Sequence, residues 1–186
     1  MARSATVTVS SDIVSVITDT EDNNTQRYNY SLGYSLVYSY GSGDLSTSAG
    51  VNQVNQFSKN TGLLAAGAEQ QIDLTAVNTT LYGNSLTVDF DEVKGLIVEN
   101  INSGTGQVIN ILATGTNAFT NMFNGESGNM KINPYGTYHY SDIYGTPVTS
   151  SNRLLYLRNN GSDSVSYSIV IVGINSGLLT DSIPTP

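Results

Sequence analysis

The sequence predicts an all-β protein, an antiparallel β-sandwich that is jelly-roll-like and carries an N-terminal extended arm. First, the 186 residues include 23 Ser, 20 Thr, 20 Asn and 18 Gly, which are neutral to poor in helix interiors. Second, apolar and polar residues alternate with a period of two, as they do in half-buried strands. Third, turn-forming clusters separate about eight to ten such segments, a pattern typical of a sandwich, jelly roll or barrel.

The length indicates a single domain. A chain of this size buries roughly 70% of its unfolded surface, so it needs no disulfide to fold, and it contains no Cys. We expect residues 1–186 to form one unit in which 1–26 are a strand or arm. Residues 27–176 are then the sandwich and 177–186 a surface tail.

The clearest strand covers residues 28–40. Tyr28, Tyr30, Tyr34 and Tyr38 fall on one face together with two leucines, and mostly small polar residues fall on the other. This tyrosine face is either one wall of the core or a contact with another subunit or a ligand. Residues 5–17 also alternate. They either add to a sheet of a neighbouring subunit or pair within their own sandwich.

Further strands are expected at 72–74, 86–90, 108–113, 130–132, 153–158 and 165–172. Residues 93–101 are apolar on both faces, which predicts a central strand covered on both sides. In the segment 51–68, Val51, Val54 and Phe57 are spaced three apart and an Ala-rich stretch follows, so we expect one short helix there. Residues 135–150 read as a Tyr-rich loop.

Charge limits the classes of partner. The net charge is -8, the pI is about 4.3 and only seven residues are Lys or Arg. The basic residues are therefore too few to form a patch that binds phosphates, and we expect no nucleic-acid partner. The N-terminal residues alternate and do not form the apolar run of a secretory signal. No apolar run of about 18 residues occurs either. We expect a protein made in a cytoplasm, with no membrane partner.

Groups for catalysis or metal binding are few, since there is no Cys and one His. Asp89, Asp91 and Glu92 cluster at the end of an expected strand. They could form a calcium site, an acid–base pair or a solvated turn, and we favour the turn. The acidic segment 19–24 lacks the Gly and Glu that an EF-hand loop needs. Gly104-Thr-Gly106 does not extend to a phosphate-binding fingerprint. We expect no enzyme activity, no metal and no cofactor.

His139 lies between two tyrosines and has no nucleophile motif to serve as a general base. A packing or hydrogen-bonding role is the expectation for it. The residues that form a candidate interaction surface are Tyr28, Tyr30, Tyr34, Tyr38, Tyr138, His139 and Tyr140.

The stretch from Leu81 to Gly173 contains Leu-Ile-Val-Glu-Asn at 96–100 and Tyr-Ser-Ile-Val-Ile-Val-Gly at 167–173. It resembles small jelly-roll virion proteins of tailed bacteriophages, of the type that decorates or cements the capsid. This resemblance implies a homo-oligomer, with a trimer favoured, bound to a major capsid protein lattice on the head exterior. The resemblance would make the N-terminal residues 1–66, which lie outside it, an arm that grips the shell.

A second reading is a carbohydrate- or receptor-binding β-sandwich, for instance of a phage tail or fibre. There the tyrosine face or the loop from Tyr135 to Tyr144 binds the ligand.

Overall fold

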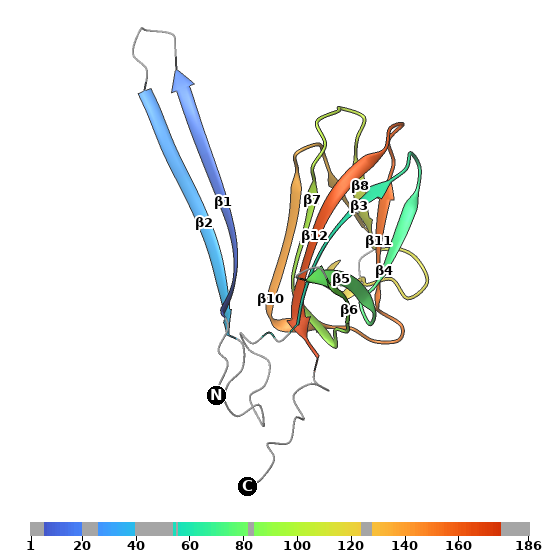
Figure 1. The fold of residues 1–186 in the computed structure, drawn as a ribbon. Coiled ribbons are helices and arrows are strands. Elements are labelled where there is room, and N and C mark those ends of the chain that lie inside the picture. The colour runs from blue at the N-terminus through green and yellow to red at the C-terminus, as the bar shows by residue number, and fades with distance from the viewer. Residues whose placement is uncertain are drawn as a thin grey trace.

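The computed structural model describes residues 6–19, 26–39, 54, 56–81, 84–123 and 128–175, and for 6–19 and 26–39 it describes the path of the backbone. These residues are nearly all β (Figure 1), and their one helical element is the short 3-10 turn η1 (Asn121–Phe123). The strands are β1 (Thr6–Asp19), β2 (Gln26–Ser39), β3 (Gln56–Leu64), β4 (Glu69–Asp73), β5 (Val77–Leu81), β6 (Asn84–Val88), β7 (Glu92–Asn100), β8 (Ile109–Leu112), β9 (Asn129–Ile132), β10 (Thr137–Pro147), β11 (Leu154–Asn159) and β12 (Val165–Ile174).

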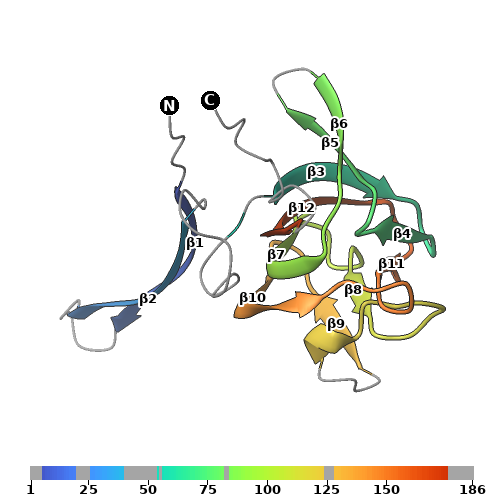
Figure 2. The same cartoon turned by 90° about the horizontal axis from the view of Figure 1, so that it is seen from below.

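Two four-stranded antiparallel sheets form the sandwich, with the orders β10-β7-β12-β3 and β4-β11-β8-β9 (Figure 2). The antiparallel pairs are nested: β3 pairs with β12, β4 with β11, β7 with β10 and β8 with β9. A long hairpin rolled over on itself has this arrangement, and it is the jelly-roll topology. The predicted fold class is therefore confirmed.

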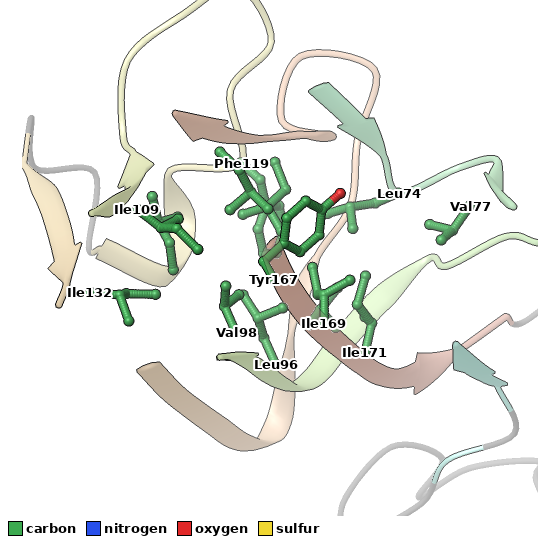
Figure 3. Packing of buried hydrophobic residues seen from close by; sticks show 14 of the residues in the cluster. Leu74, Val77, Leu96, Val98, Ile109, Phe119, Ile132, Tyr167, Ile169 and Ile171 are labelled. Atoms are coloured by element: carbon green, nitrogen blue, oxygen red, sulfur yellow. The ribbon is translucent and has the colours of Figure 1, made fainter. Parts of the chain in front are cut away.

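The core lies between the two sheets. Alternate positions of β7 and β12, including Leu96, Val98 and Ile169, point inward and meet Ile109 of β8 and Phe119 of the following loop (Figure 3). All five side chains are at most 2% exposed. Strand β7 lies between β10 and β12 and is mostly buried, as the apolar pattern at 93–101 predicts.

The helix expected within 51–68 is wrong, because β3 occupies Gln56–Leu64. The residues of β3 that face inward include Ser58, Asn60 and Gly62, which are small or polar, so the strand has no apolar alternation to detect. A Cβ on Gly62 would overlap the ring of Tyr167, its cross-strand partner. The glycine thus makes room for an aromatic side chain of the neighbouring strand.

The loop expected at 135–150 is also largely wrong, because Thr137–Pro147 form β10. The pairing of β10 with β7 shifts between Ser141 and Thr146, where the chain bulges. Gly145 adopts a φ of 86° in this bulge. The sequence does not predict β10 because this strand contains residues typical of turns. Such residues are tolerated there because β10 is an edge strand, and bulges and Pro are features of sheet edges.

The N-terminal segment pairs with the tyrosine strand and with neither four-stranded sheet. Strands β1 and β2 form a hairpin of 14 residues in each strand, in a two-stranded sheet of its own. Figures 1 and 2 show this hairpin outside the sandwich. Residue 40, the segment 20–25 and the expected surface tail lie outside the described residues.

Buried asparagines link the loops to the strands. Asn159 is fully buried, and its amide oxygen accepts a hydrogen bond of 2.8 Å from the backbone of Gly161. Its amide nitrogen donates to the carbonyls of Leu64 (3.1 Å), Ala65 (3.0 Å) and Asp163 (2.7 Å). One side chain therefore joins the β3–β4 turn to the β11–β12 hairpin.

Two other buried asparagines act in the same way. Asn100 donates to the carbonyls of Gln107 (2.8 Å) and Ile132 (3.2 Å). Asn152 donates to the carbonyl of Pro147 at 3.0 Å. Part of the polarity that the composition shows in place of charge is thus inside the protein as hydrogen-bonded amides.

Candidate functional site

The three predicted interaction residues on β10 do not share one surface. Tyr138 and Tyr140 are partly buried against the core, whereas His139 lies between them on the opposite face and pairs with Ile97 of β7. The ring of Tyr138 lies 6.4 Å from that of Phe123, centroid to centroid, at a tilt of 39°. The two tyrosines therefore contribute to the edge of the core.

Burial governs the ionisation of these groups. It raises the pKa of Tyr138 and of Tyr140, and it lowers the pKa of His139 below its ordinary value. The hydroxyl of Tyr140 also donates to Asp142 Oδ2 at 3.3 Å and shares a hydrogen bond with Thr146. These bonds close the bulge of β10 and hold the edge strand in place.

The four predicted tyrosines of the N-terminal region occupy alternate positions of β2. The register places Tyr28, Tyr30, Tyr34 and Tyr38 opposite uncharged residues of β1. Directly opposite residues of an antiparallel pair lie on the same face. The positions that share this face are 7, 9, 11, 13, 15 and 17 of β1 and 28, 30, 32, 34, 36 and 38 of β2. All twelve are Val, Ile, Leu, Tyr or Ser.

The acidic cluster lies in a turn. Strand β6 ends at Val88, so Asp89 and Asp91 do not follow one another along a strand, and Asp89 is exposed. Partial burial, and then the charge of Asp91, raises the pKa of Asp89. Among the described residues, no three His, Asp or Glu side chains come together as metal ligands would. The acidic segment 20–24 lies outside that part of the chain.

Lys94 is a buried cation that the sequence analysis did not single out. Its side chain is fully buried, and Nζ lies 3.6 Å from Oε2 of Glu92. Burial lowers the pKa of Lys94, and the charge of Glu92 opposes that shift. Both residues belong to β7, at the place where this strand is out of step with β10 and β12.

A polar cavity of about 310 Å³ opens on the side of the sandwich where β3 and β4 are the edge strands of the two sheets. We call it the amide pocket. Its principal lining side chains are Asn60, Gln70, Gln71, Asp73, Asn78 and Tyr167. Sequence reasoning missed the pocket, because these residues come from four separate segments. The pairing of β3 with β12, the contact of β5 with β3 and the hydrogen bond from Tyr167 to Gln70 bring them together.

Two exposed tyrosines lie in the region predicted as a loop. Tyr135 is 75% exposed and Tyr144 is 69% exposed. Tyr135 adopts a φ of 56°, which lies in the left-handed region of backbone conformation. Residues other than glycine rarely enter this region. Its backbone N–H donates to the carbonyl of Asn102 at 3.1 Å, which holds this conformation.

No family model matches the chain, and no curated protein matches it. The solved structures that show some likeness include the following three. A mitogen from Yersinia pseudotuberculosis is 12% identical, with a TM-score of 0.36 over 72% of this chain and 98% of the mitogen. The cupin domain of Schizosaccharomyces pombe Cnp3 is 13% identical, with a TM-score of 0.30 over 93% of each chain. A Bacillus endospore appendage pilus protein is 10% identical, with a TM-score of 0.27 over 66% of this chain and 93% of that protein.

These proteins share a β-rich build with this chain, and at such values nothing further follows from the likeness. No helix among the described residues is long and apolar enough to span a membrane.

Proposed function

We propose that this chain is a virion structural protein, namely a capsid decoration or cement protein on the outside of a tailed-phage head. It acts as a homo-oligomer, with a trimer favoured, bound to the lattice of the major capsid protein. The observation that carries the proposal is the β1–β2 hairpin, which pairs with neither sheet of the sandwich and has one face of twelve uncharged positions.

We expect a hairpin of this kind to need a binding partner for stability. A lone two-stranded sheet is marginally stable in water. At about 3.3 Å per residue, its 14-residue strands run for about 45 Å. With two strands about 4.8 Å apart, one face offers roughly 450 Å², about half of what each partner contributes to a stable interface. Contact with more than one neighbour supplies the rest, as in a closed homo-oligomer.

The sandwich supports the same role. Jelly rolls occur in viral capsid and lectin domains. The net charge of -8 suits the outside of a shell and is repelled by packaged DNA. The chain also holds its loops with buried amides, so its rigidity depends little on salt. A module that endures outside the cell benefits from each of these properties.

The second candidate is a carbohydrate- or receptor-binding module of a phage tail or fibre. Two observations favour it: the high exposure of Tyr135 and Tyr144, and the strained backbone of Tyr135. Exposed tyrosine rings serve as platforms for sugars and protein partners, and backbone strain in a non-glycine residue is found disproportionately at functional sites.

Co-sedimentation with capsids tests the first candidate. The full chain is mixed with capsids of the virus that encodes it, and we expect saturable binding at a fixed ratio to the major capsid protein. Tyr34→Lys places a charge on the uncharged hairpin face and should abolish binding. Ser35→Lys, one residue along and on the other face, is the matched control. Equal binding by both variants, or none by the unaltered chain, would refute the proposal.

A further inference from the structure

We propose that the amide pocket binds a neutral saccharide unit, such as the terminal residue of a glycan. The pocket is distinct from the hairpin and from the exposed tyrosines, so this inference does not depend on the proposed virion role. At about 310 Å³, it lies at the lower end of the range of about 300–1,000 Å³ for small-ligand sites.

One wall of the amide pocket is fixed by Tyr167. Its ring lies over Gly62 of β3, and its hydroxyl donates to Oε1 of Gln70 on β4 at 2.8 Å. This bond crosses from one sheet to the other, and Figure 3 shows the hydroxyl directed to the side of Leu74 and Val77. The bond uses the carbonyl of Gln70, which leaves the amide nitrogen of that side chain to donate to a ligand.

The opposite wall is held by β3 and β5. The hydroxyl of Thr79 is buried between these strands, accepts from the backbone N–H of Lys59 at 3.3 Å and donates to its carbonyl at 3.1 Å. This double contact brings Asn60 next to Asn78, and the amide nitrogen of Asn60 donates to the carbonyl of Asn78. The amide oxygen of Asn60 therefore has a fixed direction before any ligand arrives.

The charge in the pocket is already balanced. Asp73 Oδ1 accepts from the backbone N–H and the hydroxyl of Thr75 at 3.0 and 2.7 Å. Its Oδ2 lies 3.4 Å from Nη1 of Arg153. The pocket therefore offers no uncompensated charge to attract a charged ligand. A neutral ligand does not need such a charge to bind.

The chemistry of the lining matches a sugar. Amides offer both donors and acceptors, and a sugar hydroxyl is also both. The exposed Gln71 and Asn78 widen the polar rim, while Ile72 and Ala76 give a small apolar surface for the C–H face of a ring. Small-ligand sites combine apolar contact with a few oriented polar groups in this way.

Titration of the ¹⁵N-labelled full chain, followed by NMR, tests the proposal. The probes are the methyl glycosides of glucose, galactose, mannose and N-acetylglucosamine, with N-acetylneuraminic acid as the charged comparison. We expect saturable shifts of the side-chain amide signals of Asn60, Gln70 and Gln71 with at least one neutral glycoside. N-acetylneuraminic acid should bind more weakly than that glycoside.

Two variants separate a pocket from an unspecific effect. Gln71→Ala removes an exposed lining amide and should weaken binding about tenfold, the effect of one hydrogen bond. Asn129→Ala removes an exposed amide on β9, at the far edge of the same sheet, and should leave binding unchanged. The inference is wrong if no neutral glycoside gives saturable shifts, if Gln71→Ala binds as well as the unaltered chain, or if the charged sugar binds more tightly. Capsid binding would be untouched by any of these results.

Discussion

At the residue scale, buried asparagines carry the cross-links that ion pairs carry in more charged proteins. Two ion pairs join described residues, Lys94 with Glu92 and Arg153 with Asp73. Asn159 alone makes four hydrogen bonds to three backbone carbonyls and one N–H. A neutral amide has a smaller desolvation cost than an ion, so a buried, fully bonded amide is the less costly cross-link.

Truncation of Asn159 should therefore be severe. Asn159→Ala leaves three carbonyls and one N–H without their partner, and we expect the free energy of unfolding to fall by about 3 kcal/mol. The neighbouring Asn160 is exposed, so Asn160→Ala should change it by less than about 0.5 kcal/mol. Urea unfolding of both variants measures the difference, and equal effects would show that the buried network contributes little.

His139 should make stability depend on pH. Burial lowers its pKa in the folded state, so between that pKa and the ordinary value near 6.5 the unfolded chain binds more protons. Stability should therefore fall as the pH drops through this window and level off below the folded-state pKa. Since the chain has one His, the difference between the unaltered chain and His139→Asn isolates this contribution. Unfolding curves with the same pH dependence for both proteins would contradict the assignment.

At the element scale, Gly62 limits how β3 and β12 pair. A Cβ at this position overlaps the Tyr167 ring, so Gly62→Ala should lower the free energy of unfolding by about 1–3 kcal/mol, as other overpacked sites do. The matched control is Gly128→Ala, where an added Cβ meets nothing within 4 Å. Thermal unfolding compares the two. A similar melting temperature for both variants would mean that the ring moves aside at no cost.

The hairpin is the element on which assembly depends in this account. We expect Ile13→Lys, on the uncharged face, to convert the full chain from an oligomer to a monomer, because a charge would be buried in the contact. Ser10→Lys, on the other face, should leave the oligomer intact. Sedimentation equilibrium gives the mass of each species. A monomeric unaltered chain, or an oligomeric Ile13→Lys variant, would contradict this account of the hairpin.

The sequence predicts the strands whose inward positions are apolar. Strand β12 shows this pattern, and so does β7, whose apolar residues on both faces match its central place. It does not predict β3, whose inward positions include Ser58 and Asn60, or β10, whose bulge contains Gly145. The pairing of β3 with β12 and of β10 with β7 determines these two strands. Their local sequence patterns do not indicate them.

The amide pocket shows the same limit at longer range. Gln70 and Tyr167 are 97 residues apart in the chain and meet through one hydrogen bond. A pair of glutamines at the start of a short strand gives no local signal of a site. The nested pairing of the jelly roll creates the neighbourhood, so the pocket becomes visible only with the fold.

At the scale of the whole molecule, the chain combines a rigid jelly roll with a two-stranded hairpin that pairs with neither of its sheets. The sandwich buries its own core between its two sheets, and the hairpin has a long uncharged face. In the proposed virion role, the hairpin serves assembly and the sandwich faces the outside of the particle. The amide pocket, on the side of the sandwich, would then belong to the part that faces the surroundings.

Quantitative mass spectrometry of purified virions tests the central claim most directly. The account predicts that this chain is present at a fixed ratio to the major capsid protein, and that the ratio stays constant through successive purification steps. A chain that is absent from the particles, or whose ratio falls with each step, would contradict a structural role in the virion.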